Sequence, residues 1–176
     1  MLGIAIPERV TGVDLMLNLV KKASEKSYKL YFLGAKKEVV KKLVEMFKIE
    51  NPDLQIVGYR NGYFSQSEEK QVVEEIKNSG ADILFVGVSS PKKKFFLNKY
   101  AKYMEVPFVM GLGGSFNVVA GYVRRAPIWM RRAGLEWLYR LNTEPRRMWK
   151  RYLTTNTIFL GMVLKALITG KRIGWL

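Results

Sequence analysis

The chain has 176 residues, which is enough for one domain with its own core and a short appendage. It contains no His and no Cys, which excludes thiol nucleophiles, imidazole bases, disulfides and zinc sites built from those ligands. Lys and Arg number 30 against 15 acids, for a formal net charge of +15. Residues 121–176 hold twelve of these cations and two acids, so the C-terminal third indicates an anionic partner: nucleic acid, anionic lipid or a diphosphate.

Helical and strand patterns alternate along the first two thirds of the chain. Thr11 is the predicted N-cap of the first helix, and Ser67 is the predicted N-cap of the third. The expected helices cover 11–26, 36–47, 67–77 and 91–103, and the expected strands cover 28–33, 55–59, 82–88 and 107–112. Strands separated by helices favour an α/β fold with a parallel, Rossmann-like sheet flanked by helices. Right-handed crossovers would then place the loops after Val88 and Leu112 at one common end of that sheet.

The pattern changes after Leu112, where short helical pieces interrupted by prolines are expected. The last apolar stretch, 157–168, has about 12 residues, fewer than the roughly 20 that a helix needs to cross a bilayer. It is long enough to lie on a membrane or to pack on the body. We therefore divide the chain into an α/β body, 1–120, and an Arg/Trp-rich helical appendage, 121–176.

Two loops at the predicted end of the sheet could bind an anion. The segment 111–116, GLGGSF, follows a strand and could open a helix, so its backbone amides suit a diphosphate. A tight turn that needs positive φ explains these glycines equally well. The segment 89–94, SSPKKK, places three lysines at a helix N-terminus, where the helix dipole disfavours positive charge. An anion bound nearby would offset that repulsion, so the arrangement indicates an anion site. A solvated basic turn is the alternative there.

The segment 124–152 combines cations with aromatic side chains. It holds nine Lys and Arg against two Glu, and three of its aromatic residues are Trp129, Trp137 and Trp149. Arginine grips phosphate oxygens bidentately, and tryptophan favours the membrane–water interface or stacks on bases. The residues alone leave three interpretations open: a membrane-facing substrate clamp, a surface for single-stranded nucleic acid, and a solvated basic helix.

Several motifs taken together resemble one known family. They are PERVTGVDL (7–15), GYF (62–64), SSPKKKFF (89–96), GLGGSFNVVAG (111–121), RRAP (124–127), GLEWLYRL (134–141) and EPRRMWKRY (144–152). Their order and spacing look like the WecG/TagA/CpsF glycosyltransferases, glycosyltransferase family 26. The resemblance implies bacterial, membrane-associated, inverting enzymes on an α/β fold. It also implies transfer of a sugar of the N-acetylmannosamine type from a UDP donor to a polyprenyl-diphosphate-linked acceptor, in cell-surface polysaccharide or teichoic acid synthesis.

The resemblance further implies where the two substrates bind. The implied donor- and phosphate-binding residues are Arg9, Lys92, Lys93, Gly111, Gly113, Gly114 and Ser115. The implied acceptor-diphosphate and membrane residues are Arg140, Arg146, Arg147 and Arg151. No metal or other cofactor is expected, and nucleic acid is not among the expected partners. The expected location is cytoplasmic and peripheral, on the inner face of the bacterial cell membrane, and the family leaves room for a homo-oligomer.

The sequence departs from the family pattern in three places. The family has a further segment before PERVTG with an Asp-Gly motif whose Asp is the expected general base, so we expect the catalytic base to lie before residue 1. The acid of the family's P-K-x-E turn is Lys94 here, and the Asp after G-G-S-F is Asn117. Both changes remove a negative charge. The alternative function is therefore a catalytically inactive, truncated homologue that only binds diphosphate or anionic membrane.

Overall fold

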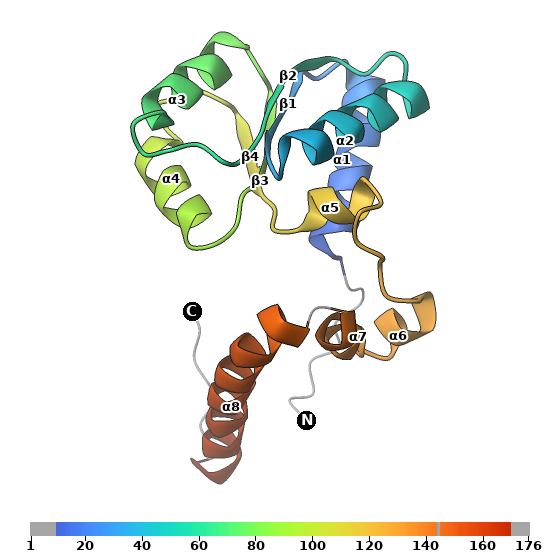
Figure 1. The fold of residues 1–176 in the computed structure, drawn as a ribbon, viewed down its shortest axis with the longest axis vertical. Helices are drawn as coiled ribbons and strands as arrows, with labels where there is room; N and C mark the ends of the chain where they lie inside the picture. The colour runs from blue at the N-terminus through green and yellow to red at the C-terminus, as the bar shows by residue number, and fades with distance from the viewer. Residues whose placement is uncertain (1–9, 144, 170–176) are drawn as a thin grey trace. The chain divides into compact units, whose positions relative to one another are not determined.

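A computed structural model describes residues 10–143 and 145–169 of the chain. The chain divides into two compact units, Met1–Arg124 and Arg125–Leu176 (Figure 1). The division lies four residues after the boundary expected from the sequence at 120/121, and both positions follow the last helix of the first unit.

The first unit is built on a four-stranded sheet with the order β2-β1-β3-β4. The strands are β1 (Leu30–Gly34), β2 (Ile56–Arg60), β3 (Ile83–Gly87) and β4 (Phe108–Gly111). All three strand pairs are parallel, with Gly34 opposite Gly87 and Val86 opposite Gly111 at their carboxyl ends. The predicted parallel α/β sheet is thus confirmed, and the loops after β3 and β4 leave the sheet at the same end.

Helices cover both faces of this sheet. One face carries α1 (Gly12–Lys26), α2 (Lys37–Glu50) and α5 (Ser115–Val119), and the other carries α3 (Glu69–Asn78) and α4 (Lys92–Tyr100) (Figure 1). The apolar residues of α2 recur at helical spacing and are buried, because that spacing places them on one side of the helix. They are Val39, Val40, Leu43, Val44 and Phe47.

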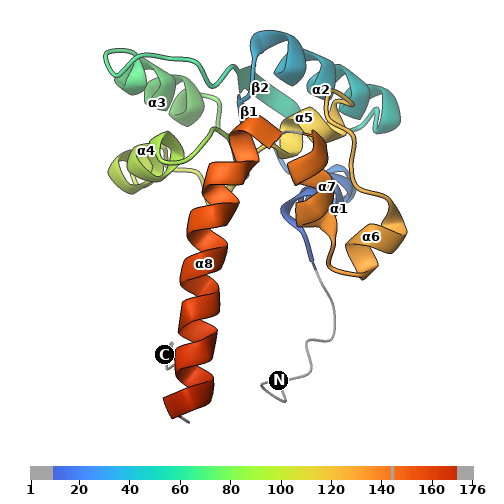
Figure 2. The same ribbon diagram turned by 60° about the horizontal axis from the view of Figure 1, so that its bottom comes forward.

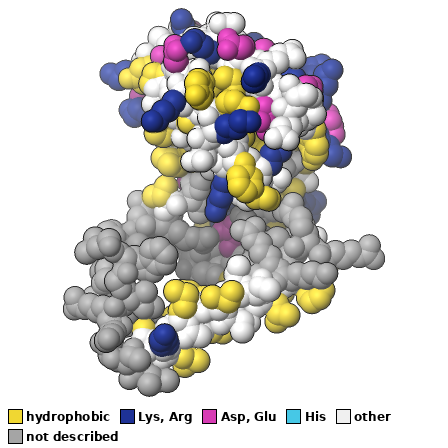
Figure 3. Space-filling model, turned by 90° about the vertical axis from the view of Figure 1, so that its left-hand side faces the viewer, with side chains coloured by type: hydrophobic (Ala, Val, Ile, Leu, Met, Phe, Trp, Pro, Cys, Tyr) yellow, Lys and Arg dark blue, Asp and Glu magenta, His cyan; other side chains and the backbone are white. Residues whose placement is uncertain are grey.

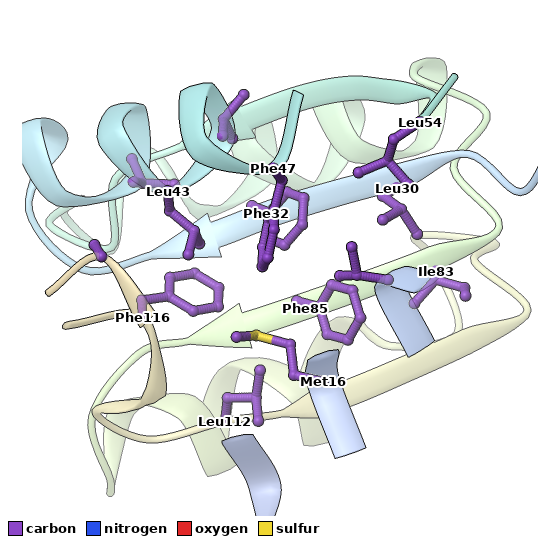
Figure 4. Packing of buried hydrophobic residues seen from close by; sticks show 14 of the residues in the cluster. Met16, Leu30, Phe32, Leu43, Phe47, Leu54, Ile83, Phe85, Leu112 and Phe116 are labelled. Carbon is purple, nitrogen blue, oxygen red and sulfur yellow. The ribbon is translucent and has the colours of Figure 1, made fainter. Parts of the chain in front are cut away.

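The central strands feed two hydrophobic cores through the alternation of their side chains. Phe32 and Phe85 point to the side of α1, α2 and α5, while Leu33 and Val86 point to the side of α3 and α4. The ring centroids of Phe32 and Phe85 lie 5.3 Å apart, and Phe116 of α5 packs edge-on against Phe32 at 5.9 Å (Figure 4). Burial on both faces explains why these strands read as nearly continuous apolar runs.

The predicted N-cap of α1 is confirmed, whereas the predicted N-cap of α3 is not. Thr11 caps α1, since its hydroxyl oxygen accepts a hydrogen bond from the backbone N–H of Asp14. The predicted cap at Ser67 is wrong, because α3 begins at Glu69 with Glu68 at the N-cap. The Glu68 carboxylate instead accepts hydrogen bonds from the backbone N–H and the hydroxyl of Ser65, each at 2.7 Å. That local turn takes the place of a serine cap.

The second unit consists of α6 (Ile128–Arg132), α7 (Glu136–Thr143) and α8 (Pro145–Thr169) (Figure 2). The expected short pieces occur at α6 and α7. The segments 145–152 and 157–168, however, join into one helix of 25 residues, about 37 Å long at 1.5 Å per residue. In the described residues, no helix is both long and apolar enough to cross a membrane.

Candidate functional site

The strand order creates a topological switch point at the carboxyl end of the sheet. The chain moves from β1 outward to β2 on one side, and then returns to β3 and β4 on the other side. The loops after β1 and β3 therefore leave in opposite directions, and ligands of open α/β sheets bind at such a switch point. We call the loops 61–65, 88–91 and 112–114, with the N-terminal turns of α1 and α4, the carboxyl-end site.

Glycines at the ends of the central strands are required by packing. A Cβ built on Gly34 would lie 2.5 Å from the Cα of Gly87, and Gly34 has φ 151°, which an L side chain rarely adopts. A Cβ on Gly87 would lie 2.6 Å from the ring of Phe116. The N–H of Gly62 donates to the carbonyl of Ala35 at 2.8 Å, which ties the loop after β2 to the loop after β1. These three glycines have a structural role.

Gly113 and Gly114 are different. A Cβ on either glycine would meet no heavy atom within 4 Å, and both residues are exposed. Neither has positive φ, and Gly114 has φ −77° and ψ 15°, which other residues adopt easily. The tight-turn interpretation of these glycines is therefore wrong. Their backbone N–H groups also donate no backbone hydrogen bond within the described residues. Among the described residues, the two glycines thus leave their amides without a hydrogen-bond acceptor and the space beside them empty.

This contrast gives a stability prediction. Gly34→Ala should lower the free energy of unfolding by about 3 to 5 kcal/mol, because the new methyl group overlaps the Gly87 backbone and φ becomes strained. Gly114→Ala should change it by less than about 1 kcal/mol, since the backbone angles are ordinary and the space is open. Urea unfolding of both variants measures the two values. Equal losses would contradict the division of the glycines into two kinds.

Lys92 and Lys93 begin α4 but have different surroundings. The Lys92 ammonium group donates to the carbonyl oxygens of Gly62, at 3.3 Å, and Phe64, and lies 3.7 Å from the centroid of the Phe64 ring. It therefore holds the loop after β2 against α4. This contact shows Lys92 to be a structural clamp, and leaves its expected phosphate contact a prediction.

Lys93 instead reaches the loop after β4. Its ammonium group donates to the carbonyl of Leu112 at 3.1 Å, and its Cδ and Cε would lie 3.4 Å from a Cβ on Gly111. Gly111 thus leaves room for the lysine stem. Partial burial, and then the neighbouring charge of Lys94, lower the pKa of Lys93. Of the two lysines, Lys93 is the one beside the open amides of the glycine loop.

The first turn of α1 adjoins the same loop. A Cβ on Gly12 would lie 3.2 Å from Leu112 Cδ2 and 3.9 Å from the Ser115 hydroxyl. The hydroxyl of Thr11 donates to the Asp14 carboxylate at 2.6 Å, so Asp14 also belongs to this turn. Ser115 is half-buried at the start of α5, as expected. Arg9 lies outside the described residues, so its expected donor contact stays a prediction.

A sequence model of the WecG/TagA/CpsF glycosyl transferase family matches residues 1–173. The chain belongs to this family. It is 38% identical over 154 residues to an N-acetylglucosaminyldiphosphoundecaprenol N-acetyl-beta-D-mannosaminyltransferase of Bacillus spizizenii, covering 88% of this chain and 59% of that protein. A Bacillus subtilis protein of the same name is 37% identical over 149 residues, covering 85% of this chain and 57% of that protein. The chain thus spans less than two thirds of these relatives.

The two internal positions at which the sequence is expected to depart from an acidic pattern of the WecG/TagA/CpsF family lie in α4 and α5, the helices that follow β3 and β4. Lys94 is exposed in the first turn of α4, and Asn117 is half-buried in α5. The segments 88–94 and 111–117 contain three lysines and no acid. No cluster of acidic residues that could hold a metal is found in the part of the chain that the structure describes. These two segments are therefore cationic and suit an anion.

The arginines expected at the acceptor lie in the second unit of this family member. Arg140 is in α7, and Arg146, Arg147 and Arg151 are in the first two turns of α8. Their side chains lie outside the described residues, so their roles stay predictions. Near them along the chain, Trp137 and Trp149 have exposed fractions of 44% and 49%. Glu136 is buried in the first turn of α7, although acidic side chains in proteins are mostly exposed.

Sequence reasoning missed the loop after β2 as part of this site. The motif GYF at 62–64 entered only through the family resemblance. The structure brings it to the carboxyl-end site through the Gly62 N–H and the Lys92 ammonium group. One signal was available, since Gly34 and Gly87 end β1 and β3, and Gly62 comes two residues after β2.

Proposed function

We propose that this chain contains the donor-binding α/β domain of a glycosyltransferase that uses a UDP-linked sugar of the N-acetylmannosamine type. The acceptor is a polyprenyl-diphosphate-linked sugar, by analogy with the Bacillus relatives. The observation that carries the proposal is the pair Gly113 and Gly114, whose amides are open and whose backbone needs no glycine for packing. The donor diphosphate binds these amides, because a run of free N–H groups favours an anion.

Lys93 supplies the positive charge at this site. A leaving UDP gains negative charge as the sugar departs, and a fixed cation stabilises that charge in the transition state. The Lys93 ammonium group has three donors and uses one on the carbonyl of Leu112. The remaining two donors are directed to the donor phosphates.

The experiment that tests the donor site compares the two lysines. UDP should bind the wild-type protein, and Lys93→Met should weaken that binding at least about tenfold, since it removes a charged hydrogen bond. Lys92→Met should keep the affinity within about threefold yet lower the unfolding free energy by about 1 to 3 kcal/mol, because the clamp on the loop after β2 is lost. Titration calorimetry and urea unfolding measure both.

The pH dependence of UDP binding adds a second readout. The lowered pKa of Lys93 means that this side chain loses its proton at a lower pH than an ordinary lysine does. UDP affinity should therefore fall early as the pH is raised, and the fall should be missing in Lys93→Met. Absence of UDP binding to the wild-type protein would remove the proposed function. Equal affinities of wild type and Lys93→Met would remove only the role of Lys93.

A specific observation favours the second candidate function, a homologue that binds diphosphate and anionic membrane without catalysis. An inverting transfer needs a base to take the proton of the acceptor hydroxyl. The segments 88–94 and 111–117 supply none, and Lys94 and Asn117 stand where the family pattern has acids. Asp14, in the first turn of α1, is the carboxylate that adjoins the loop, and Thr11 holds it by a hydrogen bond.

The second unit is proposed to face the inner surface of the cell membrane. The twelve cations of residues 121–176 favour an anionic surface, and each one near such a surface contributes about 1 kcal/mol. Trp129, with 65% of its side chain exposed, and the exposed apolar residues of α8 add burial in the interface. Peripheral binding would bring the unit to an acceptor whose prenyl chain is embedded in that membrane.

A further inference from the structure

A groove lies between α7 and α8, within the second unit. Its volume is about 340 Å³, within the range of roughly 300–1,000 Å³ that is typical of small-molecule sites. The residues that line it are Leu141, Trp149, Leu153, Asn156, Thr157 and Leu160. The Thr157 hydroxyl donates to the carbonyl of Leu153 in its own helix, so it does not call for a polar ligand. The lining is thus mainly apolar.

The lining residues of α8 follow one stripe of the helix. Trp149, Leu153, Asn156 or Thr157, and Leu160 succeed one another at intervals of three or four residues, which places them on one face. Figure 3 shows apolar side chains along the described part of α8. The groove therefore runs lengthwise along the helix, and α7 closes one side of it through Leu141.

Charge changes along α8 rather than around it. The first two turns, 145–152, carry four cations, and the next three turns, 153–164, carry no charge. A ligand that lies along this helix would therefore meet cations at one end and apolar side chains at the other. An amphiphile with a diphosphate head and a hydrocarbon chain has that distribution of charge.

We propose that this groove holds the first isoprene units of the prenyl chain of the acceptor. The inference rests on the proposed function for the identity of the acceptor. A single chain suits a lining that follows one stripe of α8, and Ile158 and Phe159, each 64% exposed, lie outside that lining. The diphosphate then lies near the cationic turns of α8, and the groove sets the position of the lipid.

Prenyl diphosphates of increasing length test the proposal on the full chain without vesicles. Farnesyl diphosphate should bind at least about tenfold more tightly than geranyl diphosphate, because five more carbons are buried, and inorganic diphosphate should bind most weakly. Binding should change the fluorescence of Trp149, and Trp149→Phe should remove that change. Affinities that do not depend on chain length would overturn the proposal.

Two leucines of equal exposure provide the matched variants. Leu160 and Leu164 both have an exposed fraction of 58%, but only Leu160 lines the groove. Leu160→Gln should weaken farnesyl diphosphate binding about tenfold or more, and Leu164→Gln should leave it within about twofold. Equal losses would mean nonspecific adsorption to an apolar helix and would contradict the groove. Circular dichroism checks that both helices are intact.

Two further measurements distinguish a prenyl-chain groove from a dimer interface and from the donor site. If the groove is filled by a second copy of the chain, sedimentation should show a dimer that Leu160→Gln disperses and farnesyl diphosphate does not, which would overturn the proposal. UDP binding measured on the same samples reports on the donor site independently. Loss of UDP binding with length-dependent prenyl binding retained would remove the proposed function while leaving the groove as a lipid-chain site.

Discussion

A protein of this sequence is expected to bind UDP but to transfer the sugar of UDP-N-acetylmannosamine below about 0.1 s⁻¹. Ordinary enzymes turn over near 10 s⁻¹, and the loss of a general base costs about 10²- to 10⁴-fold. The physical reason is that segments 88–94 and 111–117 of the carboxyl-end site offer no carboxylate to accept the acceptor proton, and that the Asp14 carboxylate in the first turn of α1 is hydrogen-bonded to the Thr11 hydroxyl. Release of UDP, measured with a prenyl-diphosphate-linked N-acetylglucosamine acceptor, gives the rate.

The contrary outcome has a defined follow-up. Turnover near 1 s⁻¹ or faster would show that a residue present here acts as the base. Asp14 adjoins the glycine loop through the first turn of α1, and Glu136 is a buried acid of α7. Asp14→Asn and Glu136→Gln then identify it, because loss of the base lowers kcat by at least about 10²-fold while UDP affinity persists. An inactive wild type with intact UDP binding supports the noncatalytic alternative.

Deletion of residues 145–176 should abolish binding to anionic vesicles and leave the first unit folded. The deletion removes seven of the twelve cations of residues 121–176 and the exposed apolar side chains of α8. At about 1 kcal/mol for each cation near the surface, the affinity should fall at least about a hundredfold. All four strands and both hydrophobic cores lie before the deletion. Vesicle sedimentation and thermal unfolding measure the two effects.

Salt and nucleic acid supply the controls for vesicle binding. Binding of the full chain should weaken between 0.1 M and 1 M salt, as the Debye length falls from about 10 Å to about 3 Å. A salt-resistant part should remain from apolar side chains such as Phe159, which is 64% exposed. If the full chain ignores anionic vesicles at low salt yet binds single-stranded DNA tightly, the membrane proposal is wrong and the nucleic-acid interpretation of 124–152 takes its place.

The sequence by itself determined the architecture of the first unit. Apolar residues at a spacing of three or four in α2, and unbroken apolar runs such as 82–88, specify helices and doubly buried strands through local periodicity alone. Alternation of these elements requires parallel strands, and parallel strands place the loops after β3 and β4 together. The family could also be identified from the sequence, because each of its motifs is a short run of consecutive residues that can be recognised without a structure.

Only the tertiary structure decided what individual residues at the site do. Lys92 and Lys93 are adjacent and chemically identical, yet one clamps the loop after β2 and the other reaches the loop after β4. Gly34 and Gly114 likewise differ in their neighbours and in their backbone angles: Gly34 adjoins the backbone of Gly87 at 2.5 Å with φ 151°, whereas no described atom lies within 4 Å of a Cβ on Gly114, which has φ −77°. The groove between α7 and α8 depends on Leu141 meeting α8. Such contacts join residues far apart in sequence, and local pattern carries no information about them.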